Sequence, residues 1–139
     1  MDYAIKTEIP DPDAVEYSFL EQKTMYGGKH IMAGDTIYLF SSENEGGCGL
    51  VARGTVIDAV EVPRKANVVR QTPRVSLKVR RSDLASRPLG RCELAQHKDW
   101  DDGKPETELN FKFYRQATDK VIGLSDSAAA FLNGFFQSS

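Results

Sequence analysis

The stretch from Ala33 to Val62 constrains the fold more than any other part of the chain. It holds two runs rich in Val, Ile, Tyr and Phe, at 36–40 and 48–62, separated by a polar segment that ends in two glycines. Two such runs around a glycine-containing connection are typical of a β-hairpin. The first run is apolar throughout, which predicts a strand buried on both faces. In the second run the alternation breaks near Gly54, which predicts a β-bulge. Asp35, just before the first run, is expected to hold the turn into it.

The rest of the chain supplies further short elements. We predict strands at 3–9, 74–80 and 109–114, helices at 14–23 and 125–134, a helical turn at 82–85 and an exposed loop at 96–108. The last helix has a serine at its expected start and a glycine near its expected end, the residue types that cap helices. Five or six short strands at close spacing favour a small β-barrel, and the peripheral helices make the fold class α+β.

Composition limits the class of protein. With 139 residues, 40% apolar and 27% charged, the chain fits one soluble domain over residues 1–139. Its apolar runs fall short of the ~20 residues of a membrane helix, and its N-terminus lacks a signal-peptide pattern. Cys48 and Cys92 lack metal or redox spacing and indicate a reduced compartment. We therefore expect a cytoplasmic protein without membrane contact.

Charge is segregated along the chain. Residues 1–62 carry 4 basic and 11 acidic side chains, residues 63–91 carry 9 and 1, and residues 92–139 carry 5 and 8. Long-range attraction depends on local potential, so the basic block says more about partners than the net charge of −2 does.

The basic block contains the clearest strand pattern in the sequence. Apolar residues at 75, 77 and 79 face one side, while Arg74, Lys78 and Arg80 face the other. Arg81 and Arg70 extend the basic side. Clustered cations of this kind predict phosphate contacts driven by counterion release. The alternative is a solvated outer face whose cations pair with acidic residues elsewhere.

The sequence offers little for catalysis or metal binding. His30 and His97 lie in polar segments, away from a second ligand at zinc-site spacing. The acidic cluster at 99–102 lacks the calcium-loop pattern, and the glycines at 46–49 are not followed by the Lys-Ser/Thr of a phosphate-binding loop. We therefore predict that the chain is not an enzyme and uses no metal and no cofactor.

Trp100 is the only tryptophan and lies in a polar segment between two aspartates. A large indole in such a place either anchors the loop on the core or offers a stacking surface to a base. Tyr26 and Tyr38 are further aromatic candidates, although Tyr38 lies in an apolar run and is more typical of core.

An ordered series of short motifs runs through the chain: YAIKTEIPD at 3–11, IMAGDTIYLFSS at 31–42 and GLVARGTV at 49–56. The series continues with the strand at 75–79 and the segment KVIGLS at 120–125. In content, order and spacing it resembles the EVE domains of the PUA-like superfamily, which are related to ASCH and YTH domains. The resemblance covers nearly the whole chain.

The resemblance implies a small PUA-like mixed β-barrel with peripheral helices, acting as a nucleic-acid reader. Several such domains accommodate a modified, flipped base in a pocket of aromatic and polar groups. By matched position or by proximity to matched motifs, the pocket would use Tyr26, Lys29, Ser41, Ser42, Asn44 and Trp100. The phosphate contacts would be Arg74, Lys78, Arg80 and Arg81. The chain lacks the tryptophan usual beside Tyr3 and the Trp-containing segment before the hairpin, a departure that bears on base preference.

Two rival functions stay open at this point. The first is a binder of a free nucleotide or other small molecule, which would use the same pocket. The second is an enzyme that acts on RNA or a nucleotide, an activity that a barrel of this kind could also support. The lack of a His, Cys or carboxylate constellation argues against the enzyme. Salt dependence separates the first rival from a polymer binder, because a free nucleotide releases few counterions. The sequence is compatible with DNA or RNA, and with a nuclease as partner in trans.

Overall fold

The predicted hairpin is present in the computed structural model, which describes residues 2–43, 47, 49–63, 73–97, 102–116 and 120–136. It consists of β3 (Thr36–Ser41) and β4 (Gly49–Glu61), which pair antiparallel. The predicted bulge is confirmed, because the register of β4 against the next strand shifts between Arg53 and Gly54. A Cβ at Gly54 would lie 2.7 Å from the carbonyl oxygen of Arg80, so the close approach of the two strands requires glycine.

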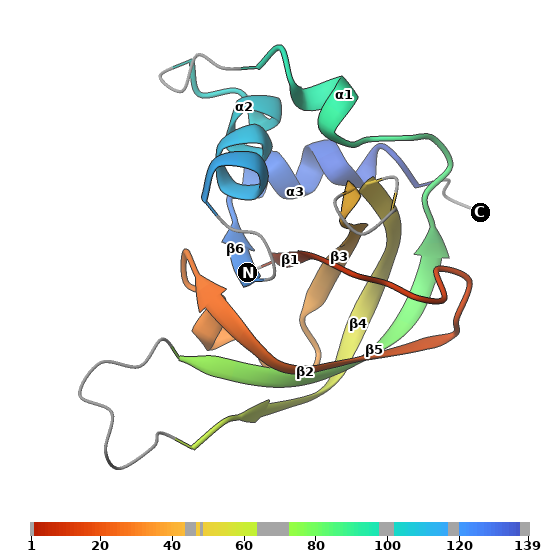
Figure 1. Cartoon of the computed structure of the whole chain (residues 1–139), viewed down its shortest axis with the longest axis vertical. Helices are drawn as coiled ribbons and strands as arrows, with labels where there is room; N and C mark the ends of the chain where they lie inside the picture. The colour runs from red at the N-terminus through yellow and green to blue at the C-terminus, as the bar shows by residue number, and fades with distance from the viewer. Residues whose placement is uncertain are drawn as a thin grey trace.

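Six strands close into a barrel in the order β1–β3–β4–β5–β2–β6 (Figure 1). The remaining strands are β1 (Asp2–Thr7), β2 (Glu16–Met25), β5 (Arg74–Leu84) and β6 (Lys120–Leu124). β1 pairs in parallel with β3 and β2 with β6, whereas the other neighbours are antiparallel. The prediction of a small mixed α+β barrel is therefore confirmed.

Short helices gather over one side of the barrel (Figure 1). They are α1 (Arg91–Leu94), α2 (Pro105–Asn110) and α3 (Asp126–Asn133). α2 continues into the π-helical turn η3 (Phe111–Gln116). A 3₁₀ turn, η1 (Gly28–His30), follows β2. The predicted start of the last helix is confirmed, because the Ser125 hydroxyl accepts the Ala128 N–H at 3.2 Å. None of the described helices has the length and apolar character needed to cross a membrane.

Two apolar clusters hold the fold together. One fills the barrel and includes Tyr3, Ile5 and Val79; the other lies between the barrel and the helices and includes Ala4 and Leu132. Neighbouring residues of β1 thus belong to different clusters, because successive side chains of a strand point to opposite faces. β1 is buried on both sides for this reason.

The prediction of a helix at 14–23 is wrong, because this segment forms most of β2. Tyr17 and Phe19 point into the barrel, while Val15 and Leu20, which suggested a helical stripe, are 64% and 72% exposed. The register of β2 against β5 shifts after Phe19, and Glu21 has a φ of +50°. This irregularity breaks the alternation that would have revealed a strand.

The prediction of a strand at 109–114 is also wrong, because α2 ends and η3 begins there. Leu109 and Phe113, four residues apart, are both fully buried, which is the spacing of a helix face. α2 begins at Pro105, so the expected loop at 96–108 ends earlier than predicted. The expected helical turn at 82–85 is wrong as well, since β5 extends to Leu84.

Candidate functional site

Ser41 and Ser42, two residues of the predicted base pocket, lie where β1 and β3 end side by side. Ser41 is the register partner of Thr7, and the Ser42 N–H donates to the Thr7 carbonyl oxygen at 2.9 Å. Ser42 is 1% exposed, and its hydroxyl has no hydrogen-bond partner among the residues that the structure describes. A buried hydroxyl without a hydrogen bond lowers the stability of the fold by about 1–3 kcal/mol, unless a bound partner supplies the hydrogen bond.

Gly47 packs directly against these serines. Its N–H donates to the carbonyl oxygen of Ser42 at 2.8 Å. A Cβ at Gly47 would lie 2.1 Å from the Ser41 hydroxyl oxygen, so only glycine fits at this position. Gly47 therefore lies directly against the end of β3.

The structure also buries Lys6 at this end of the barrel, a residue that sequence reasoning missed. Lys6 is 1% exposed and is the register partner of Phe40. It alternates with Ala4 along β1 and therefore faces the helices, as Phe40 does; the Phe40 ring packs on Phe113 at 4.5 Å between centroids. Ser42 follows Phe40 by two residues and shares its face. The only signal in the sequence is a lysine that directly follows the apolar run Tyr3–Ile5.

Tyr26 and Lys29 lie at the other end of the barrel from the two serines. The carbonyl oxygen of Tyr26 accepts the Gly123 N–H at 3.1 Å, and Gly123 is the register partner of Tyr3. Tyr3 precedes Thr7 by four residues, which places the two ends about 13 Å apart along β1 at about 3.3 Å per residue. The structure therefore does not bring Tyr26 and Lys29 together with the serines.

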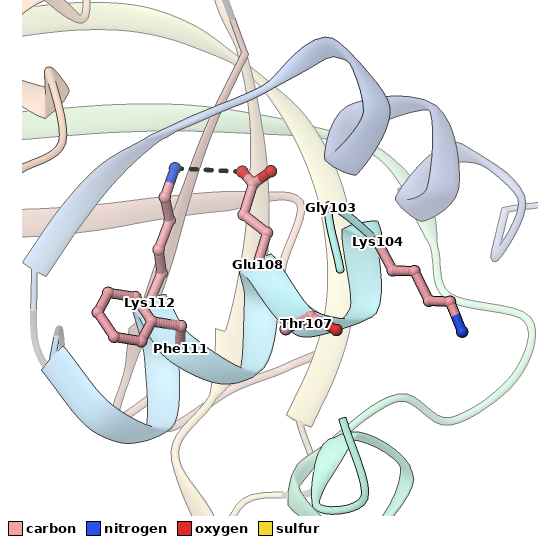
Figure 2. Close-up of a pocket in the computed structure, with 6 residues that line it drawn as sticks. All are labelled: Gly103, Lys104, Thr107, Glu108, Phe111 and Lys112. Atoms are coloured by element: carbon pink, nitrogen blue, oxygen red, sulfur yellow. Dashed lines mark hydrogen bonds and ion pairs between the residues drawn. The ribbon is translucent and has the colours of Figure 1, made fainter. Parts of the chain in front are cut away.

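Tyr26 is held in an unusual conformation. Its φ of +52° lies in the left-handed region, which is uncommon for residues other than glycine, and its side chain is 37% exposed. The ammonium nitrogen of Lys112 lies 4.8 Å from the centroid of its ring. The same nitrogen donates to the Gly123 carbonyl oxygen at 2.9 Å and lies 3.1 Å from the Glu108 carboxylate (Figure 2).

Glu108 is the hub of this network. Its carboxylate accepts the Ser125 N–H at 3.0 Å and also the Ser125 hydroxyl. Burial alone would raise the pKa of Glu108, but the bonds from Ser125 and the charge of Lys112 outweigh it and hold the pKa below its usual value. A cleft of about 310 Å³ lies beside it, lined by Gly103, Lys104, Thr107, Glu108, Phe111 and Lys112 (Figure 2). Of the predicted pocket residues that the structure describes, Tyr26, Lys29, Ser41 and Ser42, none lines this cleft.

Arg74, Lys78 and Arg80 point outward from β5, as their alternation with buried valines and leucine predicts, and Arg81 follows them directly. Each of these four cations has a neighbour that competes with a phosphate. The Arg80 guanidinium lies 3.8 Å from Glu16, and Lys78 is the register partner of Asp58. Arg81 donates to the Asp13 carbonyl oxygen at 2.7 Å, and Arg74 donates to the Glu21 carbonyl oxygen at 2.9 Å. Their role in phosphate binding stays a prediction.

Asn44, Arg70 and Trp100 lie outside the described residues, and their roles stay predictions too. Within the described ranges, no three His, Cys, Asp or Glu side chains are grouped in a way that could hold a metal ion.

Comparison with known proteins gives the fold. No protein-family model and no curated protein matches the sequence. The DUF55 domain of human thymocyte nuclear protein 1 matches with a TM-score of 0.63 at 11% identity, covering 96% of this chain and 97% of that one. Human THYN1 in complex with DNA containing 5-methylcytosine matches with a TM-score of 0.64 at 11% identity, covering 99% and 98%. A Pseudomonas putida protein matches with a TM-score of 0.61 at 13% identity, covering 97% and 99%. The resemblance to EVE domains is thus confirmed at the level of the fold.

Proposed function

We propose that this chain binds nucleic acid and accommodates a modified, flipped base where β1 and β3 end. The observation that carries the proposal is the buried Ser42 hydroxyl, which lacks a hydrogen-bond partner among the described residues. Flipped bases are read in closely fitting pockets by hydrogen bonds to their edges. A base edge that reaches Ser42 satisfies the hydroxyl and removes the cost of its burial.

Lys6 suggests which kind of edge is read. Its ammonium is a donor only and lies on the face that Ser42 shares. A base that presents a carbonyl oxygen or a ring nitrogen acceptor suits this pair better than one that presents donors alone. Ser41, Asn44 and Trp100 complete the proposed pocket by their matched or neighbouring positions, with Trp100 as an aromatic wall.

The fold adds support of a different kind. THYN1, which shares the fold across nearly its whole length, has been crystallised with DNA containing 5-methylcytosine. A barrel of this architecture therefore has room for a nucleic-acid partner in at least that protein. For the present chain we propose a binding function without catalysis, with DNA or RNA as the polymer.

Replacement of Ser42 tests the proposal. We expect Ser42→Ala to bind oligonucleotides containing 5-methylcytosine, or another modified base, about tenfold to a hundredfold more weakly, because one or more hydrogen bonds to the base are lost. Its stability should stay constant or rise by up to about 1 kcal/mol, because the hydroxyl has no protein partner to lose. Fluorescence anisotropy and thermal unfolding measure the two effects.

Thr24→Val is the matched control. Thr24 is 8% exposed, but its hydroxyl donates to the Pro73 carbonyl oxygen at 2.8 Å. This variant should lose about 1 kcal/mol of stability and keep its affinity. The proposal is wrong if Ser42→Ala binds like the unmodified chain, or loses stability as Thr24→Val does. Binding with almost no dependence on salt would favour the free-nucleotide alternative.

A further inference from the structure

The last part of β4 has a neighbouring strand on one side only. The pairing of β3 with β4 ends at Thr55, and the turn before β3 adds one contact, in which the Asp35 carbonyl oxygen accepts the Val56 N–H at 2.8 Å. β5, by contrast, pairs with β4 as far as Glu61. From 57 to 61, the side of β4 that faces away from β5 therefore has no strand beside it in the part of the chain that the structure describes. Figure 1 shows this end of β4 at the lower edge of the sheet.

The backbone groups of Ala59 and Glu61 point to this open side. The Val62 N–H donates to the Arg74 carbonyl oxygen at 3.0 Å, which makes these two residues a hydrogen-bonded pair. Such pairs alternate along an antiparallel ladder, so Val60 also bonds to β5, whereas the N–H and C=O groups of Ala59 and Glu61 point away from it. The open edge thus presents two N–H and two carbonyl groups that have no partner among the described residues.

Val60 stands between these backbone groups. Its side chain is 54% exposed, and its register partner is Ser76, whose neighbours Val75 and Leu77 are the residues of β5 that point into the barrel. An exposed sheet edge is a template for another strand unless it is blocked, most often by lysine or proline, and the segment 57–61 contains neither. An apolar side chain is therefore held in solvent at the centre of an open edge.

The open edge is complementary to a second copy of itself. An antiparallel pairing centred on Val60 places Ala59 of each copy opposite Glu61 of the other, so the open N–H and carbonyl groups of the two copies bond to one another. Val60 then faces Val60 of the second copy in a non-hydrogen-bonded pair, in which the Cα atoms lie about 4.5 Å apart. Asp58 faces Val62, so no two acidic side chains lie directly opposite each other.

The limits of the open edge fit the same arrangement. The turn at Asp35 occupies the edge up to Val56, so a second strand has room only beyond that residue. In the pairing centred on Val60, the residue opposite Ile57 is Pro63, which has no N–H to donate and lies just outside β4. The added strand therefore ends where the room for it ends.

We propose that the end of β4 is a dimerisation surface, at which two copies of the chain join their β2–β5–β4 sheets into one continuous sheet. The contact is isologous, because each copy offers the same segment to the other. The segment is short, so the dimer is weak, with a dissociation constant on the order of 100 μM. The inference is independent of the proposed function, because self-association is measured without nucleic acid.

Disulfide trapping tests the register. In a background in which Cys48 and Cys92 are replaced by serine, Val60→Cys should form a disulfide-linked dimer under mild oxidation, because a Cα separation of about 4.5 Å suits a disulfide. Asp58→Cys is the matched control, since the two copies of residue 58 would lie about 14 Å apart along the strands. We expect about tenfold more linked dimer from Val60→Cys than from this control on a non-reducing gel.

Sedimentation velocity tests the association without a covalent link. Between about 10 μM and 1 mM the unmodified chain should pass from monomer to dimer. Val60→Lys should stay monomeric over this range, because it places two like charges directly opposite each other at the two-fold axis. Its melting temperature should match that of the unmodified chain, since the position is exposed. Ser42→Ala should dimerise as the unmodified chain does.

Three results would overturn the inference. Equal yields of linked dimer from Val60→Cys and Asp58→Cys would show that the pairing is not centred on Val60. A dimer that Val60→Lys leaves intact would form through a different surface. A chain that stays monomeric at 1 mM would show that a second copy does not cover this edge.

Discussion

Asp35 shows how one side chain sets the start of a strand. Its carboxylate accepts the Met32 N–H at 2.9 Å, and its own N–H donates to the Met32 carbonyl oxygen at 3.1 Å. Gly34, with a φ of +97°, donates its N–H to the Val56 carbonyl oxygen at 2.7 Å, which ties the turn to β4. The turn therefore depends on a glycine for its backbone conformation and on an aspartate for its closure, as the sequence predicts.

Asp35→Ala should lower the free energy of unfolding by about 1 kcal/mol, because the Met32 N–H loses its acceptor. Asp35→Asn keeps a side-chain oxygen and should lose less. Thermal unfolding measures both variants, and their nucleic-acid affinity should match that of the unmodified chain. A variant that keeps its melting temperature but no longer binds would place Asp35 in the binding site instead.

At the scale of single elements, the predictable strands are those whose pattern is local. The apolar run at 36–40 corresponds to β3, and the alternation at 74–80 corresponds to β5. Each keeps one regular burial pattern along its length, continuous burial in β3 and burial of every second residue in β5 up to position 79. β2 was missed because its bulge after Phe19 exposes Leu20 and shifts the alternation. The end of α2 and the turn η3 read as a strand because Leu109, Phe111 and Phe113 are spaced by two as well as by four.

The proposed site divides in the same way. The positions of Ser41 and Ser42 at the end of β3 can be predicted because they follow directly from the β3 motif, and their role in binding stays a prediction. The burial of Lys6 could not be predicted, because it depends on the pairing of β1 with β3, which is distant in the sequence. The sequence predicts Tyr26 in the same pocket from its position before the β3 motif, but the pairing of β2 with β6 places it at the opposite end of the barrel.

The network on α2 makes stability depend on pH. The pKa of Glu108 lies below its usual 4.5 in the folded chain, so the ionised carboxylate stabilises the fold above that pH. This contribution is lost as the pH falls through the lower, folded pKa. Glu108→Gln should therefore lower the free energy of unfolding by about 1–3 kcal/mol near pH 7. The difference from the unmodified chain should shrink once the pH falls below about 4.5. Urea unfolding at several pH values measures it, and a pH-independent difference would contradict the assignment.

Across the whole molecule, the end of α3 and the residues that follow it join the helix layer to the barrel. The Tyr38 hydroxyl of β3 and the Arg53 guanidinium of β4 both donate to the side-chain oxygen of Asn133, the latter at 3.0 Å. Burial raises the pKa of Tyr38 to about 12, so it keeps the proton that it donates. Arg53 also lies 4.8 Å from the ring centroid of Phe136, which closes the helix-side cluster. Strands β3 and β4 are thus tied to the end of α3 through these contacts, which predicts that the helix layer and the barrel unfold as a single cooperative unit.

Phe136→Ala tests that cooperativity. The ring is 7% exposed and packs 6.1 Å from the ring of Tyr38, so its removal should cost about 3 kcal/mol through lost burial and an unfilled space. Phe131→Ala is the matched control, because Phe131 is only partly buried and should cost about half as much. If the clusters unfold together, both variants lower the denaturant midpoint and leave the slope m unchanged. A lower m, or two separate transitions, would show that the helix layer unfolds independently of the barrel.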